Sequence, residues 1–190
     1  MSKITLKGGT LLAPIPPVMV SCSDGEKDNI ITIAWSGILA TQPPTTYISV
    51  RPSRFSYGMI KKSGEFVINL TDRDLTRAAD YCGIYTGAKV DKFEKCKLTK
   101  EKASYVSCPM IAESPLSIEC KVREIIPMGS HDVFVADILA VNVRDDILDE
   151  TGRICMEKAS LTAYAHGEYF ALGRSLGKFG FSATKNKKRR

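Results

Sequence analysis

The chain has 190 residues, 44% of them hydrophobic, which is enough for one sizeable buried core. Its formal net charge is +6, but five of these charges lie in a short C-terminal run formed by Lys185, Lys187, Lys188, Arg189 and Arg190. The remainder is nearly balanced, which argues against nucleic acid as a partner, and no apolar run reaches the ~20 residues of a membrane span.

The N-terminus and the cysteines favour a reducing compartment. Residues 1–7 lack the apolar core of a signal peptide, so a cytoplasmic location is expected. The six cysteines form no CxxC pair, and there are only two histidines, so no metal site is expected. We interpret all six cysteines as free thiols.

The first half of the chain reads as short strands separated by turns. Apolar and β-branched residues predict strands over 18–22, 29–36, 47–51 and 65–70. A short helix is predicted over 56–62, with Ser53 or Ser56 as its cap and Ser63-Gly64 as its end. Asp72 or Asp74 is expected to cap a second helix that passes through Cys82 and is closed by Gly83.

Two longer strands are predicted in the second half. Over 116–123, apolar residues alternate with Ser117, Glu119, Lys121 and Arg123, which predicts one buried and one wet face. The segment 132–143 is apolar at nearly every position, so both of its faces are expected to be covered, at a barrel seam or a subunit interface. Residues 161–169 are ambiguous, and the Gly-rich segment 173–182 is expected to be irregular.

These elements indicate a mainly β fold with short helices. At least six strands and few helices favour a closed or partly closed antiparallel barrel. A parallel doubly wound sheet is disfavoured because no GxGxxG follows a strand. We expect a single domain over 1–190, with its core at about 14–182 and a basic tail at 185–190.

Three polar segments suggest one binding site. The first has a face of small side chains followed by Trp35, the second carries hydroxyl and guanidinium groups at a helix start, and the third is a Gly- and Lys-containing loop over 81–93. Exposed N–H groups, the helix dipole and arginine donors all favour a phosphate. A flat heteroaromatic ring with a phosphate tail would satisfy all three segments.

Each of these residues also has a purely structural interpretation. Trp35 could be a core aromatic, and Arg51 and Arg54 could form surface ion pairs with Asp72 or Glu65. Cys82 could be a buried residue at a helix end, and His131 a structural residue at the start of a strand.

The order and spacing of several motifs resemble the flavin reductase-like family with the FMN-binding split barrel, especially its flavoredoxin branch. The resemblance runs from about Pro14 to about Ser182. The motifs that carry it are residues 14–21, N-x-x-T-x-A-W-S from Asn29, S-V-R-P-S-R from Ser49, residues 65–70, Y-C-G from Tyr81 with Gly87 and D-K-F from Asp91, residues 109–113 and 116–120, and H-D-V-F from His131.

The resemblance implies a six-stranded antiparallel Greek-key split barrel, a homodimer, and non-covalent FMN near the dimer interface. It places His131 near the reactive face of the flavin, as the one candidate catalytic residue. The residues that it implies for FMN binding are Asn29, Thr32, Ala34, Trp35, Ser36, Ser49, Arg51, Ser53, Arg54, Ser56, Asn69, Cys82, Gly83, Thr86, Gly87 and Lys92.

Because FMN itself carries the redox chemistry, no acid–base triad is needed. The leading hypothesis is an oxidoreductase or electron-transfer protein of the flavoredoxin type, which exchanges electrons with a redox partner protein or a nicotinamide donor. A second is a flavin reductase that uses NADH or NADPH to supply reduced flavin to a partner monooxygenase. A third is a flavin-binding module without turnover.

Overall fold

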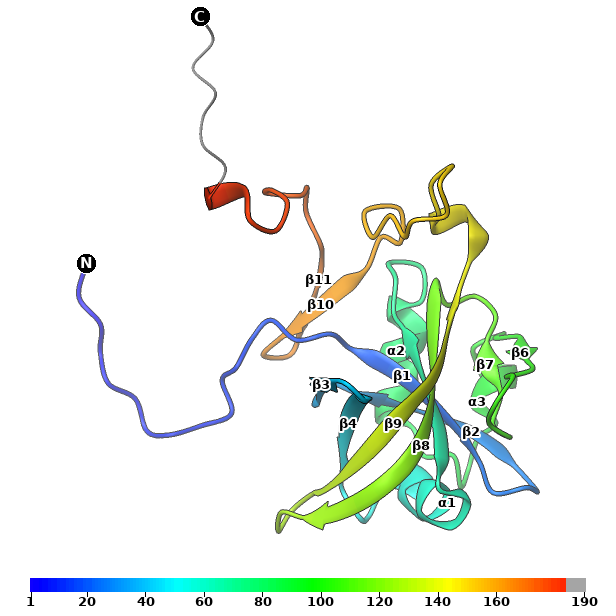
Figure 1. Cartoon of the computed structure of the whole chain (residues 1–190). Helices are drawn as coiled ribbons and strands as arrows, with labels where there is room; N and C mark the ends of the chain where they lie inside the picture. The colour runs from blue at the N-terminus through cyan, green and yellow to red at the C-terminus, as the bar shows by residue number, and fades with distance from the viewer. Residues whose placement is uncertain (184–190) are drawn as a thin grey trace, which may run out of the picture.

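A computed structural model of the chain describes residues 1–183 (Figure 1). The basic tail expected at 185–190 lies outside the described residues. The central feature is a seven-stranded antiparallel sheet with the order β2-β1-β5-β8-β9-β4-β3. Within residues 1–183, no helix is both long and apolar enough to cross a membrane.

The strands of the central sheet are short in the first half of the chain and long in the second. They are β1 (Val18–Ser23), β2 (Asp28–Ile33), β3 (Ser36–Thr41), β4 (Pro44–Val50), β5 (Glu65–Leu70), β8 (Leu116–Pro127) and β9 (Asp132–Val143). Two small sheets accompany it, built from β6 (Lys100–Glu101) with β7 (Met110–Ile111) and from β10 (Thr162–Ala165) with β11 (Glu168–Ala171). The helical segments are α1 (Phe55–Ser63), α2 (Thr76–Ile84), α3 (Lys92–Lys95), η1 (Asp145–Ile147) and η2 (Phe181–Ala183).

The sheet contains seven strands where six were predicted, because the strand predicted over 29–36 bends at Ala34 and Trp35 and then continues to Thr41, beyond its predicted end. Its first part, β2, pairs with β1, and its second part, β3, pairs with β4. The amide of Ser49 donates to the carbonyl of Trp35 at 2.9 Å, which joins the bend to β4. The bent strand thereby belongs to both edges of the sheet and closes it into the predicted class of barrel.

The helices differ from prediction mainly at their caps. Gly64 ends α1 with φ 70°, as predicted, but no side chain caps the start of α1. Ser56 is instead buried within the first turn. In α2, Gly83 lies inside the helix and does not terminate it, because the helical hydrogen bonds continue to Tyr85, whose amide donates to Tyr81.

The predicted wet face of β8 is wrong at Glu119 and Ser117, which are both buried. The loop before β7 covers this face, and the Glu119 carboxylate accepts hydrogen bonds from the amides of Ser104, Tyr105 and Val106. These bonds lower the pKa of Glu119 although burial acts in the opposite direction. A buried carboxylate is tolerated here because its oxygens are satisfied.

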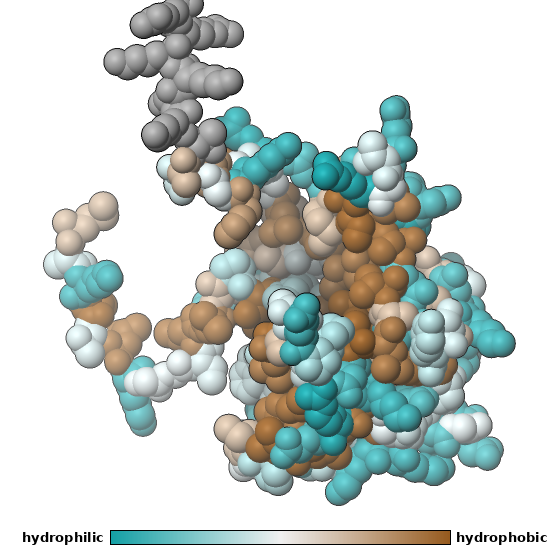
Figure 2. All heavy atoms as spheres, in the orientation of Figure 1, coloured by the Kyte–Doolittle hydropathy of each residue, from teal (hydrophilic) through white to brown (hydrophobic). Residues whose placement is uncertain are grey.

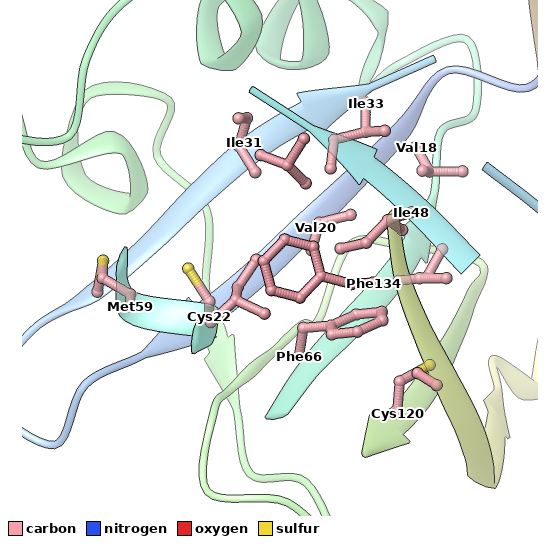
Figure 3. Packing of buried hydrophobic residues seen from close by; sticks show 14 residues of the cluster. Val18, Val20, Cys22, Ile31, Ile33, Ile48, Met59, Phe66, Cys120 and Phe134 are labelled. Carbon is pink, nitrogen blue, oxygen red and sulfur yellow. The ribbon is translucent and has the colours of Figure 1, made fainter. Parts of the chain in front are cut away.

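The main core fills the inside of the barrel. Figure 3 shows Phe66 of β5 and Phe134 of β9 lying close to Val20 and Ile48, and all four side chains are fully buried. A second cluster lies on the other side of β1 and β2, where α2 and α3 pack through Leu75, Cys82 and Phe93. These two clusters hold β2 between the barrel interior and the helices.

The outer face of β9 is uncovered in the single chain. Leu139 and Val141 are exposed, although the apolar run over 132–143 predicted two covered faces. Figure 2 shows hydrophobic atoms gathered over this side of the sheet.

The N-terminal arm, residues 1–14, is extended and exposed (Figure 1). It joins the body through Ile15, which pairs with Tyr164 of β10 by two backbone hydrogen bonds. The β10–β11 hairpin turns at His166 and Gly167, which both have positive φ, the geometry that suits a two-residue hairpin.

We expect Phe134→Ala to lower the free energy of unfolding by about 3–5 kcal/mol, because it removes a fully buried ring and leaves a cavity. Phe170→Ala, the same change at an exposed position of β11, is the control, with an effect within about 0.5 kcal/mol. Urea unfolding measures both. Equal losses for the two variants would contradict this view of the core.

Candidate functional site

Two hollows open beside the bend between β2 and β3, and they share Ile31 and Arg54. The large hollow has a volume of about 510 Å³ and the small hollow about 90 Å³. Because two residues line both, we treat them as one site with a wide part and a narrow end.

Most of the predicted site residues line these hollows. The large hollow contains Thr32, Ala34, Trp35, Ser49, Arg51, Arg54 and His131. The small hollow contains Asn29, Ser53, Arg54, Ser56, Cys82, Thr86, Gly87 and Lys92. Segments far apart in the sequence are therefore brought together by β2, β4, the start of α1 and the loop after α2.

Three predicted residues do not line either hollow. Asn69 is fully buried. Its Nδ2 donates hydrogen bonds to the carbonyl of Met19 and the hydroxyl of Ser21, and its Oδ1 accepts hydrogen bonds from the hydroxyl of Ser117 and the amide of Ile111. Ser36 lies at the start of β3, and Gly83 lies inside α2. The Asn69 side chain stabilises the packing of β1, β5 and β8, so none of its capacity remains for a ligand.

The small hollow is rich in positive charge. Arg54 and Lys92 line it, and no Asp or Glu does. Lys92 is buried, and its ammonium donates to the carbonyls of Ile30 at 2.6 Å and Cys82 at 2.7 Å. Burial lowers the pKa of Lys92, and the positive charge of Arg54 also lowers it. Within residues 1–183 neither cation forms an ion pair, so an anion here would offset the cost of burying charge.

The start of α1 points more donors toward the same place. Ser53, Arg54, Phe55 and Ser56 line the small hollow, and the first turn of α1 has no side-chain cap and no acidic residue. Uncapped N–H groups at a helix start favour an anion. Lys27 lies close by, since its ammonium donates to the carbonyl of Gly87 at 2.6 Å.

One buried acceptor in the small hollow lacks a partner. Asn29 donates through Nδ2 to the Ser56 hydroxyl at 2.8 Å, but its Oδ1 has no hydrogen-bond partner within residues 1–183. A Cβ at Gly87 would overlap the Asn29 amide, so any larger residue there would have to displace this side chain. A buried amide oxygen without a donor suggests a hydroxyl-bearing ligand or water at this point.

In the large hollow, His131 connects Trp35 with Arg51. The rings of His131 and Trp35 have centroids 4.6 Å apart, and Nε of Arg51 donates to Nε2 of His131 at 3.4 Å. Burial and the neighbouring Arg51 charge lower the pKa of His131. A neutral His131 that accepts at Nε2 carries its proton on Nδ1, which lies 3.0 Å from the Ser130 hydroxyl.

The structural interpretations of the two arginines and of Trp35 do not hold. Asp72 lies 3.9 Å from Arg144, and Glu65 accepts from Ser107, so neither acid pairs with Arg51 or Arg54. Trp35 is 40% exposed and lines the large hollow instead of the core.

Sequence reasoning missed one wall of the large hollow. Thr10, Leu12 and Ala13 come from the N-terminal arm, Ile15 follows it, and Tyr164, His166 and Gly167 come from the β10–β11 hairpin. The His-Gly pair between two short apolar runs was a usable hairpin signal. The extended arm gave no such signal, because nothing in its sequence specifies a long-range contact.

The site fits a flavin with a terminal phosphate. The small hollow offers cations, an uncapped helix start and an unpaired acceptor, and no competing carboxylate. The large hollow is lined by Ala34 and the Trp35 ring together with polar side chains such as Thr32 and Ser49. A ring in the wide part and a phosphate in the narrow end match both sets of donors.

Comparison with known proteins identifies the family. The chain belongs to the flavin reductase like domain family, whose match covers residues 12–173. It is similar to the solved flavoredoxin of Desulfovibrio vulgaris (Miyazaki F), with 32% identity and a TM-score of 0.90, over 96% of this chain and 100% of that one. The predicted family and fold class are thereby confirmed.

Two more distant proteins share this fold or family. An FMN-binding protein from Thermus thermophilus, solved with bound 1-cyclohex-2-enone, has 23% identity and a TM-score of 0.75, over 90% of this chain and 96% of that one. An NADPH-flavin oxidoreductase of Streptomyces viridifaciens is 24% identical over 136 residues, which are 70% of this chain and 69% of that protein.

The thiols are expected to be largely unreactive. All six cysteines are free. Burial raises the pKa of Cys22, Cys82 and Cys120 to about 12, and it also raises the pKa of Cys108. At pH 8, a thiol with a pKa of about 12 is ionised to roughly one part in ten thousand. Burial also raises the pKa of Cys96, but Cys96 and Cys155 are only half-buried, so a disulfide-exchange reagent at pH 8 should modify these two first and the other four after denaturation. Rapid reaction of four or more native thiols would contradict this.

Proposed function

We propose that this protein is a cytoplasmic FMN-binding flavoprotein of the flavoredoxin type, which carries electrons on non-covalent FMN. The observation that carries the proposal is the pair of connected hollows with Arg54 at their junction. The narrow end has the charge and size for one phosphate group, and the wide part has Trp35 and Ala34 in its lining, beside which an isoalloxazine ring would lie.

The narrow end favours FMN over the other flavins. Riboflavin has no phosphate to compensate Arg54 and the buried Lys92. FAD would need space for a second phosphate and an adenosine beyond a hollow of about 90 Å³. We therefore assign FMN as the cofactor, with its phosphate at the start of α1.

The chain's own residues have separate roles. Arg54 and the α1 N–H groups would bind the phosphate, Asn29 Oδ1 would accept from a ribityl hydroxyl, and Trp35 with Ala34 would position the ring. When bound, FMN supplies the one- and two-electron chemistry, and the protein supplies orientation and electrostatics. His131, beside Trp35, is our candidate for the residue nearest the reacting part of the ring.

The alternative function is an NADPH- or NADH-dependent flavin reductase that supplies reduced flavin to a partner monooxygenase. The similarity to the Streptomyces viridifaciens enzyme supports it, while the higher identity to the flavoredoxin supports electron transfer. Protein that is yellow as isolated and contains FMN would support the flavoredoxin type. Colourless protein that oxidises NADH or NADPH only with added flavin would support the reductase, and bound flavin that no biological donor reduces would support a binding module.

We also propose a homodimer that covers the outer face of β9. Leu139 and Val141 are exposed there, and this face is continuous with the hydrophobic area in Figure 2. A self-complementary apolar patch is the usual basis of a two-fold interface.

Arg54→Ala is expected to weaken FMN binding by about 1.5–3 kcal/mol, or roughly 10- to 150-fold, because it removes a charge-assisted bond to phosphate. Trp35 is the only tryptophan and lines the large hollow, so its fluorescence reports binding directly. Arg77→Ala, on the exposed side of α2, is the matched control and should bind FMN normally. Riboflavin affinity should be equal in wild type and Arg54→Ala. An unchanged dissociation constant for FMN would remove Arg54 from the phosphate site.

Val141→Lys is expected to convert the dimer into a monomer, because it places a charge in the centre of the apolar patch. Sedimentation velocity at micromolar concentration measures the change, and circular dichroism shows whether the fold is retained. Wild-type protein that sediments as a monomer would contradict the dimer.

A further inference from the structure

Arg51 differs from the other cations of the site in its position. Arg54 lines both hollows and Lys92 lines only the small one, whereas Arg51 lines only the large one. A phosphate in the small hollow would therefore satisfy Arg54 and Lys92 and leave Arg51 without an anion. The sequence pattern had grouped Arg51 with the phosphate-binding residues, and the structure separates it from them.

In the described part of the chain, no acidic residue pairs with Arg51. Within residues 1–183 it forms no ion pair, and the lining of the large hollow contains no Asp or Glu. The nearest acid in the sheet register is Asp132, which is paired with Val50, and its carboxylate accepts from the Tyr57 hydroxyl at 2.6 Å. The guanidinium is thus available to an external anion.

His131 holds one end of this guanidinium and leaves the other end free. Nε of Arg51 donates to Nε2 of His131, which is the one hydrogen bond of the Arg51 side chain among the described residues. The ring of His131 is in turn supported by Trp35 and by the Ser130 hydroxyl. The terminal N–H groups of Arg51 remain as a fork, and this geometry matches a carboxylate.

The other residues that line the large hollow, and its volume, indicate what kind of anion it would bind. Ile15, Ile33, Ala34 and Val50 contribute apolar groups to its lining, and its volume of about 510 Å³ lies in the usual range of pockets that bind small organic ligands. We propose that Arg51 binds the carboxylate of a small planar organic acid, which lies in the large hollow as the second ligand of the site. The presence of FMN as the first ligand rests on the proposed function, whereas the carboxylate site is formed by side chains of this protein.

The test is a comparison of benzoate with benzamide, a neutral molecule of the same shape. FMN-loaded wild type is titrated with each, and the change in flavin absorbance gives the dissociation constant. We expect benzoate to bind at least about tenfold more tightly than benzamide, and Arg51→Met to remove this preference. Arg51→Lys, which retains the charge but not the fork, should retain part of it.

A second readout separates this proposal from the cofactor assignment. FMN affinity, measured by Trp35 fluorescence, should be unchanged within about threefold in Arg51→Met and weakened in Arg54→Ala. If the protein binds no FMN, the proposed function fails, and the same fluorescence titration of the flavin-free protein with benzoate still tests Arg51. Equal binding of benzoate and benzamide, or a preference that persists in Arg51→Met, would overturn the proposal. So would a loss of FMN affinity in Arg51→Met equal to that in Arg54→Ala.

His131 should act here as a positioning residue for Arg51. His131→Gln retains an acceptor and is expected to keep the benzoate preference, whereas His131→Phe retains the ring beside Trp35 and is expected to reduce it several-fold. Benzamide affinity should be equal in both variants. A loss of the benzoate preference in both variants, or in neither, would show that His131 does not orient Arg51.

Discussion

The buried ammonium of Lys92 is the interaction on which the site depends. It ties α3 to β2 through the carbonyl of Ile30 and to α2 through the carbonyl of Cys82, so three elements meet at one charge. Among the described residues no carboxylate offsets this charge, and burial lowers the pKa of the group. In the proposed FMN site, an anion that binds beside Lys92 would offset the cost of burying this charge.

The rest of the fold brings this charge close to the large hollow. Because β2 bends into β3, it contributes to both edges of the barrel and presents Ala34 and Trp35 outside the core. Packing on both sides of β2, by the barrel interior and by α2 and α3, fixes the distance between Trp35 and the start of α1. The separation of a wide part from a narrow cationic end is therefore a consequence of the topology.

Much of the fold could be predicted from local sequence patterns. The strand over 132–143 follows from a nearly continuous apolar run, and the end of α1 follows from Ser63-Gly64; both are found. The errors arise where long-range contacts override local pattern: Glu119 is buried by a distant loop, and Asn69 is used entirely by neighbouring strands. The arm and hairpin that line the large hollow could not be predicted either, because the Ile15–Tyr164 pairing links residues almost 150 positions apart.

The most direct test of the central claim is a crystal structure of the protein grown with FMN. We predict phosphate density in the small hollow, in contact with Arg54 and the amides at the start of α1, and the ring in the large hollow beside Trp35. A phosphate that points into solvent, or a ring bound elsewhere on the barrel, would contradict the account.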